Sequence, residues 1–166
     1  MSENPRTEIF FRPLEPSDRT QVIQLVSQFW GEDLVISRSR SYVPSELPGF
    51  AAFQNGQMVG LATYAIQGGQ CELVTLNSRI PGEGIGRQLI TLVREQAELA
   101  GCWRLWLITT NDNTHALRFY QLAGFRLFAL YPGVVEQYRQ VKASIPQTGY
   151  DGIPLRDVLE LELLFI

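Results

Sequence analysis

The chain has 166 residues, of which 45% are hydrophobic and 19% charged, and this length and composition are those of a single globular domain spanning residues 1–166. The formal net charge of −3 argues against non-specific binding to nucleic acid, because nucleic-acid phosphates attract basic surfaces. Two cysteines and one histidine form no group with the spacing of metal ligands, so we expect buried free thiols and no bound metal.

The N-terminal part of the chain predicts a strand followed by a helix. Residues 1–10 lack the apolar core of a signal peptide, and no later stretch reaches the roughly 18 apolar residues of a membrane helix. We therefore expect a cytoplasmic protein with no membrane partner. Residues 9–14 are typical of a short strand, and Ser17 or Asp18 is a suitable N-cap for the helix. Five apolar residues then recur at the spacing of one packed helix face: Val22, Leu25, Val26, Phe29 and Trp30.

The middle of the chain predicts a loop and a strand meander. Residues 31–49 have weak periodicity, and we interpret them as a loop long enough to carry function. Asn55-Gly56 separates two apolar runs and predicts a type I′ hairpin turn, in which both residues need positive φ. Gly68-Gly69 predicts a second turn, which leads into a strand ending at Ser78.

The second half of the chain predicts helices alternating with strands. The expected elements are a helix from Ile85 to Gly101, an interior strand at 102–110, a helix at 113–124, a strand at 125–131, a short helix at 134–146 and a last strand at 158–165. The strand–helix–strand unit around the first of these helices should cross over right-handed between parallel strands. The predicted class is α+β, with a mixed, mostly antiparallel central sheet flanked by helices.

Three glycines, Gly82, Gly84 and Gly86, stand where the meander passes into a helix. A helix N-terminus exposes unpaired N–H groups, and glycines before it let the backbone approach an anion closely. The segment therefore predicts a site for a phosphorylated ligand, with Arg87 in the first helical turn as an added cation. The alternative is a tight turn in which glycine only relieves φ strain. The dinucleotide pattern G-x-G-x-x-G fails, because its last position falls on Arg87, and the Walker pattern is absent from the sequence.

The glycine segment resembles the acetyl-CoA-binding motif of the GNAT N-acetyltransferase superfamily, which reads roughly [QR]-x-x-G-x-[GA]. Gly84 and Gly86 match the motif glycines, and Gly82 matches a frequent additional one. Pro81 replaces the usual Arg or Gln, which removes one side chain and one N–H donor.

A second stretch resembles the same superfamily. Its pattern N-x-x-A-x-x-[LF]-Y-x-x-x-G-F is matched in order by Asn113, Ala116, Phe119, Tyr120, Gly124 and Phe125. With the order of elements, the resemblance covers nearly the whole chain, from Ile9 to Phe165. It implies the acyl-CoA N-acyltransferase fold and transfer of an acetyl group from acetyl-CoA to a primary amine.

The resemblance also implies roles for particular residues. Tyr120 matches a tyrosine that commonly protonates the departing CoA thiolate; its alternative is a core tyrosine. Asn113 matches a CoA contact and is equally suited to be a helix N-cap. In relatives the strand before the glycine turn splays from its parallel neighbour, so the backbone of Leu76 and Ser78 would bind the pantetheine arm, with the Leu76 N–H as oxyanion donor.

The sequence offers several carboxylates as the general base and does not choose among them. Glu72 lies four residues before Leu76, so we expect both side chains on one face of the strand, and its alternative is a solvent-facing carboxylate. Glu160 and Glu162 are weaker candidates, and we expect His115 at the surface.

The acceptor would be a small amine or a peptide amine, chosen by segments 29–49 and 131–154. An acyl-CoA-binding sensor without activity is one alternative reading, and a nucleotide-binding module is another. The last strand, 158–165, suggests a homodimer paired at a sheet edge.

Overall fold

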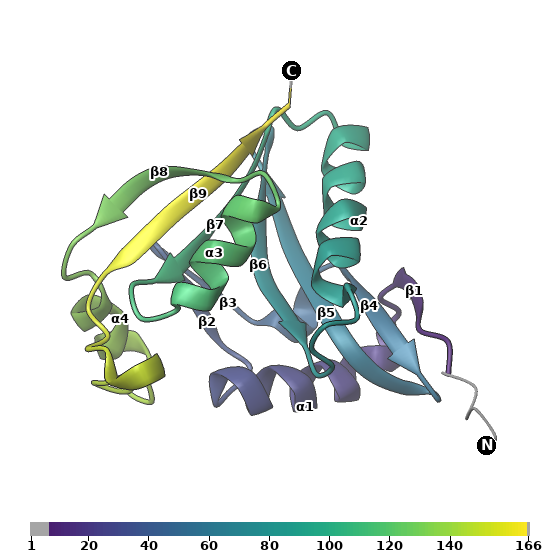
Figure 1. Cartoon of the computed structure of the whole chain (residues 1–166), viewed down its shortest axis with the longest axis horizontal. Coiled ribbons are helices and arrows are strands. Elements are labelled where there is room, and N and C mark those ends of the chain that lie inside the picture. Colours follow the sequence, from purple (N-terminus) through teal and green to yellow (C-terminus); the bar gives the residue numbers. More distant parts are fainter. Residues whose placement is uncertain (1–6, 166) are drawn as a thin grey trace.

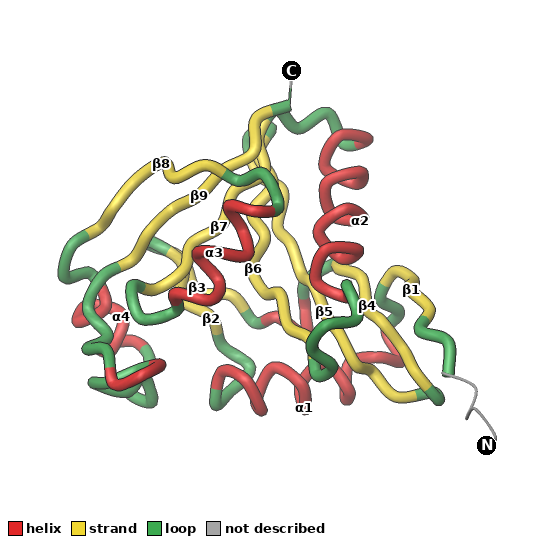
Figure 2. Tube along the Cα trace, in the orientation of Figure 1, coloured by secondary structure: helices red, strands yellow, loops and turns green. Residues whose placement is uncertain are grey.

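The computed structural model describes residues 7–165, and a seven-stranded sheet organises them (Figures 1 and 2). The strand order is β1-β4-β5-β6-β7-β9-β8, and β6 and β7 are the one parallel pair among neighbours that otherwise run antiparallel. The strands of this sheet are β1 (Phe10–Pro13), β4 (Gly49–Gln54), β5 (Gln57–Gln67), β6 (Gln70–Ser78), β7 (Arg104–Thr110), β8 (Arg126–Tyr131) and β9 (Val158–Leu164). The predicted class and fold are confirmed.

Four α-helices surround the sheet: α1 (Arg19–Trp30), α2 (Ile85–Leu99), α3 (Thr114–Leu122) and α4 (Val135–Val141). Neighbouring residues of β4 point to opposite faces of the sheet, and this alternation sorts the core into two layers. Phe50 and Ala52 pack in the cluster that contains the buried face of α2, whereas Ala51 and Phe53 pack in the cluster under α1. The two long helices therefore cover opposite faces of the sheet.

Local signals in the sequence locate most element ends correctly. Asn55 (φ 53°) and Gly56 (φ 73°) form the turn between β4 and β5, as the type I′ prediction requires. The Asn113 side chain accepts a hydrogen bond from the Ala116 N–H at 3.2 Å and caps α3. Cys71 and Cys102 are buried free thiols, as predicted.

Two expectations about the arrangement of the elements are wrong. The segment 31–49 is not a plain loop, because it contains a second, two-stranded sheet made of β2 (Val35–Ser37) and β3 (Arg40–Tyr42). We call this the β2–β3 hairpin. The last strand, β9, is not an edge strand, because it lies between β7 and β8 and is hydrogen-bonded to both. A homodimer paired at a sheet edge therefore cannot use it.

A bulge in β6 breaks the alternation of that strand. Thr75 pairs with Thr63 and Leu73 pairs with Tyr64, so Val74 is an additional residue with no partner on β5. Leu73 and Leu76 both pack in the α2 layer, whereas Glu72 contacts the β2–β3 hairpin on the other face. The expectation that Glu72 and Leu76 share a face is therefore wrong, because the bulge shifts the alternation by one residue.

The parallel strands β6 and β7 separate along their length. They pair only at three positions, from Gln70 with Arg104 to Glu72 with Trp106, and the rest of β6 has β5 as its one strand neighbour in the described chain. Since alternate N–H and C=O groups of a strand point to its two sides, part of the backbone at 73–78 faces this gap. The splay that the family resemblance implied is present.

Candidate functional site

A cleft of about 590 Å³ opens where β6 and β7 separate. Its walls come from the end of α1, the β2–β3 hairpin, β6, β7, α3 and the segment after α4. It brings together four of the residues that the sequence singled out: Glu72, Leu76, Asn113 and Tyr120. Phe29 and Trp30 also line it and are each 40% exposed, so they are cleft walls and not the packed core that we expected.

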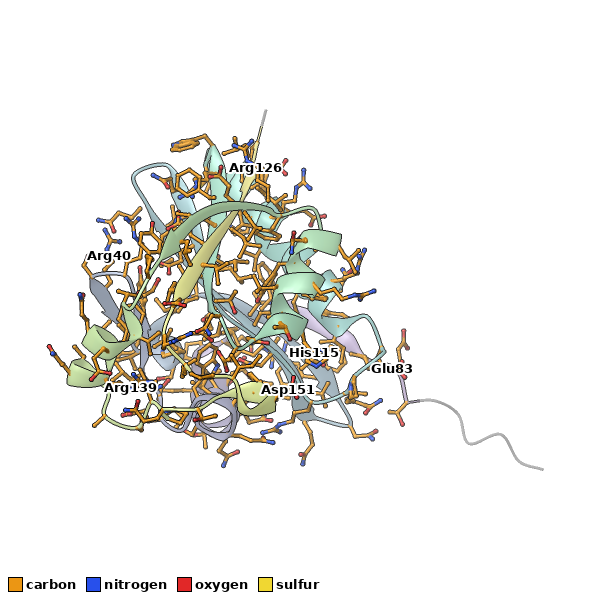
Figure 3. All side chains as sticks on the ribbon, turned by 60° about the vertical axis from the view of Figure 1, so that its left-hand side comes forward. Arg40, Glu83, His115, Arg126, Arg139 and Asp151 are labelled. Atoms are coloured by element: carbon orange, nitrogen blue, oxygen red, sulfur yellow. The ribbon has the colours of Figure 1, made fainter. Side chains whose placement is uncertain are left out.

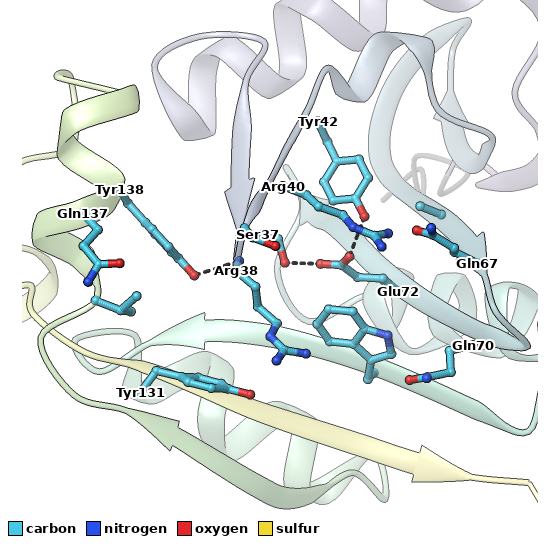
Figure 4. A pocket seen from close by; sticks show the side chains of 14 residues that line it. Ser37, Arg38, Arg40, Tyr42, Gln67, Gln70, Glu72, Tyr131, Gln137 and Tyr138 are labelled. Atoms are coloured by element: carbon cyan, nitrogen blue, oxygen red, sulfur yellow. Dashed lines mark hydrogen bonds between the residues drawn. The ribbon is translucent and has the colours of Figure 1, made fainter.

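Glu72 lies at the inner end of the cleft and is only 3% exposed. The Ser37 hydroxyl donates to one carboxylate oxygen, and the Tyr42 hydroxyl donates to the other at 2.9 Å (Figure 4). Burial raises the pKa of Glu72, and the hydrogen bonds and Arg40 oppose this shift only in part. The solvent-facing alternative for Glu72 is therefore wrong: its environment is that of a basic buried carboxylate.

Tyr120 faces the same cleft from α3. Its ring packs edge-on against Phe119 and Phe125, at centroid distances of 5.5 and 5.6 Å. No hydrogen bond joins its hydroxyl to another group of the described chain, and burial raises its pKa well above the ordinary value of a phenol. The phenol is therefore protonated at neutral pH and is available as a donor to a ligand in the cleft.

The three glycines form the turn that begins α2. Gly82 and Gly84 have φ of +77° and +72°, and a Cβ on either would meet no atom within 4 Å. The first backbone bond of the helix runs from the Gln88 N–H to the Gly84 carbonyl at 3.1 Å, and no side chain caps the end. The N–H groups of the first turn are thus free to bind an anion such as a pyrophosphate.

Neither of the two arginines near this turn, Arg79 and Arg87, points its guanidinium group into it. Arg87 donates to the Leu122 carbonyl at 3.1 Å, toward the end of α3. Arg79 donates to the Met58 carbonyl and to Gln28, both at 3.1 Å. The Ser78 hydroxyl is bonded to the Ile80 carbonyl at 3.0 Å, so Ser78 offers its backbone alone. The turn therefore offers backbone N–H groups, and neither Arg79 nor Arg87 supplies the side-chain cation or amide that Pro81 replaces.

A second cleft, of about 550 Å³, lies on the other side of Glu72. The β2–β3 hairpin forms one wall, Tyr131 lies across from it, and Tyr138 lies beside the hairpin (Figure 4). Trp106 also lines this cleft. Both clefts are lined by Glu72, Ser37 and Tyr138, so they meet at the carboxylate. The arrangement can hold two reactants that approach one carboxylate from opposite sides.

The remaining sequence candidates lie elsewhere. Glu160 and Glu162 are buried on β9 and are neutralised by Arg104, so they form a structural ion cluster. His115 is exposed at the start of α3 (Figure 3). Within residues 7–165, no three His, Cys, Asp or Glu side chains are arranged to hold a metal ion. In the same range, no helix is long and apolar enough to cross a membrane.

The comparisons with known proteins agree with this geometry. The model of the "Acetyltransferase (GNAT) family" matches residues 13–125. The Bacillus subtilis protein YdhI, described as uncharacterized, is 41% identical over 140 residues, which cover 84% of this chain and 85% of that protein. A B. subtilis spermine/spermidine N(1)-acetyltransferase is 31% identical over 85 residues, which cover 45% of this chain and 56% of that enzyme.

A solved structure shows the same fold. It is described as a putative streptothricin acetyltransferase from Bacillus anthracis in complex with acetyl coenzyme A. The TM-score is 0.69 and the identity 16%, and the match covers 96% of this chain and 99% of that one.

Proposed function

The chain belongs to the GNAT family of acetyltransferases, and from that premise we propose that it transfers an acetyl group from acetyl-CoA to a primary amine by direct attack on the thioester. The observation that carries the proposal is the meeting of two clefts at Glu72, beside a helix N-terminus with free N–H groups. The larger cleft follows the splayed strand from Glu72 to Asn77, five residues before Gly82. It is the proposed path of the pantetheine arm.

In the proposed reaction a carbon–nitrogen bond forms and the carbon–sulfur bond of the thioester breaks. A free alkyl amine has a pKa near 10, so the acceptor must lose a proton before or during attack. Glu72 receives that proton, directly or through water, and its raised pKa makes it a stronger base than an exposed glutamate. Tyr120 protonates the leaving sulfur and is reprotonated from solvent.

The backbone of β6 is the proposed binding surface for the thioester and the arm. The Leu76 N–H is the oxyanion donor proposed from the sequence, and the bulge adds the Val74 N–H as a second one. Gly82, Gly84 and Gly86 would cradle the pyrophosphate with the first-turn N–H groups, and Asn113, whose side chain caps α3, would present its remaining polar atoms to the arm.

The first experiment is calorimetric titration of the protein with acetyl-CoA, with ATP and NAD as controls, for wild type and Gly84→Glu. We expect saturable acetyl-CoA binding by wild type only, because the new carboxylate blocks the cradle by bulk and by like charge. Gly101→Glu, a change at another positive-φ glycine outside the turn, controls for backbone strain. A folded wild-type protein that does not bind acetyl-CoA would contradict the proposal.

A sensor that binds acyl-CoA without turnover is the second candidate. Pro81 favours it, because neither Arg79 nor Arg87 points into the turn to compensate. Turnover over a broad amine panel decides between the two. Acetylation that falls about 10²-fold or more in Tyr120→Phe and Glu72→Gln supports the enzyme, whereas binding without any product supports the sensor.

A further inference from the structure

The second cleft, which is lined by the β2–β3 hairpin, is the proposed acceptor site. It contains few carboxylates for a site that would bind a polycation. Its ionisable walls, apart from tyrosines, are Arg38, Arg40 and Glu72. Glu72 is buried, whereas Arg38 and Arg40 are exposed on the β2–β3 hairpin, with Arg40 on the side of Tyr42 and Arg38 on the side of Tyr131 (Figure 4). A ligand in the cleft therefore meets one carboxylate and two guanidinium groups.

Arg38 is held in place by its surroundings. Its backbone has φ 56°, and its N–H donates to the Tyr138 hydroxyl at 2.8 Å. Its guanidinium lies 5.9 Å from the Trp106 ring and 5.4 Å from the Tyr131 ring. Contacts of this kind orient a cation without using its N–H donors.

The donors of Arg38 are available to a ligand. Its nearest carboxylate, Glu160, is 3.7 Å away, which is beyond hydrogen-bond distance. Glu160 is already bonded by Arg104 at 2.6 Å and by the Tyr131 hydroxyl at 3.0 Å. Arg38 thus forms an ion pair with Glu160 at 3.7 Å without a hydrogen bond, and its side chain is half exposed.

Arg40 is a second cation without a close anion. Its guanidinium lies on the side of the cleft toward Tyr42 and Glu72 (Figure 4). Among residues 7–165, no carboxylate lies within 4 Å of it. Arginine pairs are well suited to bind a carboxylate or phosphonate, because the planar guanidinium donates two parallel hydrogen bonds.

We propose that the acceptor is an amine that also carries an anionic group, as in a free amino acid, with its nitrogen at Glu72 and its anion bound by Arg38 and Arg40. This inference rests on the proposed acetyltransfer and names the acceptor class. The rings of Trp106, Tyr131 and Tyr138 line other parts of the same cleft, so the side chain of the acceptor is flat or apolar. A polyamine fits poorly, because its second cation would meet the arginines.

The test compares acceptors that carry the negative charge with analogues that lack it. The panel is L-phenylalanine, L-leucine and L-methionine, each against its carboxamide, with spermidine as the polycation. We expect kcat/KM at least about tenfold higher for the acids, since only the acids accept charge-assisted hydrogen bonds from the guanidinium groups. Arg38→Gln and Arg40→Gln should reduce this ratio toward one, mainly through KM, and Arg38→Lys should restore part of it. Arg94→Gln, in an exposed pair on α2, is the matched control.

A binding measurement separates failure of this inference from failure of the proposed function. Thermal shift with the product N-acetyl-L-phenylalanine and with its carboxamide reports the arginine contacts without any turnover. Selective stabilisation by the acid that is lost in Arg38→Gln supports the acceptor class, even in a protein that acetylates nothing. Preference for the carboxamides or spermidine, or a ratio that Arg38→Gln and Arg40→Gln leave unchanged, overturns it while acetyltransfer stands.

Discussion

Glu72 has two roles in this molecule, and they have opposite requirements. As a structural residue it fixes the β2–β3 hairpin to β6 through Ser37 and Tyr42. As the proposed base it must be ionised, although it is buried. Burial raises its pKa above the ordinary glutamate value, so in the ionised form it reduces the stability of the fold.

These roles predict that Glu72→Gln gains stability and loses activity. A carboxyl whose folded pKa is raised contributes stability that is complete below the unfolded pKa, about 4.5, and is lost as pH rises through the folded pKa. The amide of Glu72→Gln does not ionise, so the variant does not lose this stability. The unfolding free energy of the variant should therefore exceed that of wild type by a margin that grows as pH rises from about 5 to 8. Urea unfolding at a series of pH values measures the difference.

The pH dependence of kcat/KM tests the catalytic role of the same residue. Wild type should lose activity on the acid side with a pKa above the ordinary value for glutamate, near 4.3, because the base becomes protonated. The variant should be about 10²- to 10⁴-fold slower and lack that limb. An unchanged acid limb in Glu72→Gln would assign the proton transfer to another group.

At the scale of elements, the sequence was informative wherever a local signal sufficed. Asn55-Gly56 and the Asn113 cap act within a few residues, so both were found. The β2–β3 hairpin was missed because its strands have three residues each, and its turn at Arg38-Ser39 contains no glycine to mark it. The hydrogen bonds of Glu72 to Ser37 and Tyr42 join positions 35 and 30 residues apart, and no local pattern predicts such a contact.

The bulge in β6 is a further feature that alternation alone could not give. Both Glu72 and Leu76 fit a regular strand, and only the pairing with β5 shows that Val74 is an added residue. The bulge keeps Leu76 in the α2 layer and turns Glu72 to the hairpin side. The carboxylate therefore reaches the second cleft while the backbone after it borders the first one.

Strands β7, β9 and β8 are joined by a buried ion cluster that should dominate their stability. Arg104 binds Glu160 and Glu162, and Arg126 binds Glu162 at 2.8 Å. Burial pushes the pKa of Glu162 upward, but the hydrogen bonds from Arg104 and Arg126 outweigh it, and the net pKa is below its ordinary value. The stability that this gives is present above about pH 4.5 and is lost as pH falls through the folded pKa.

Arg104→Met should therefore destabilise the protein by about 3–5 kcal/mol at pH 8, because it leaves two carboxylates buried with too few partners. The cost should shrink toward pH 5, where protonation relieves the unpaired charge. Chemical denaturation at both pH values measures it. Arg94→Met breaks an exposed pair with Glu98 and should cost less than about 1 kcal/mol at either pH. A pH-independent cost in Arg104→Met would mean that lost packing, not charge, is responsible.

At the scale of the whole molecule, the proposed cofactor site and the proposed acceptor site occupy two different clefts that meet at Glu72. The splay of β6 from β7 opens the proposed path for acetyl-CoA, and the hairpin with Trp106 and Tyr131 lines the proposed acceptor cleft. Family membership could be predicted from the glycines and from Asn113 to Phe125, and so could the glycine turn that begins α2. The acceptor cleft could not, because its walls come from segments that the fold alone brings together.

Strand β8, at one edge of the sheet, is a better candidate than β9 for the homodimer contact that was proposed from the sequence. β8 is paired on one side only, and it contains neither lysine nor proline, which commonly protect edge strands. Leu127, Phe128 and Leu130 are each more than half exposed on it. Two copies of β8 can pair antiparallel about a two-fold axis, since the same strand serves both subunits.

We therefore expect a dimer in solution that depends on β8. Light scattering after size exclusion should give twice the 18.8 kDa chain mass for wild type. Leu130→Lys should give the monomer mass, because it places a charge in the pairing strand. Leu99→Lys, at an 84% exposed position on α2, should leave the dimer intact. A monomeric wild type would remove the dimer from the proposal, and a dimer that withstands Leu130→Lys would place the interface away from β8.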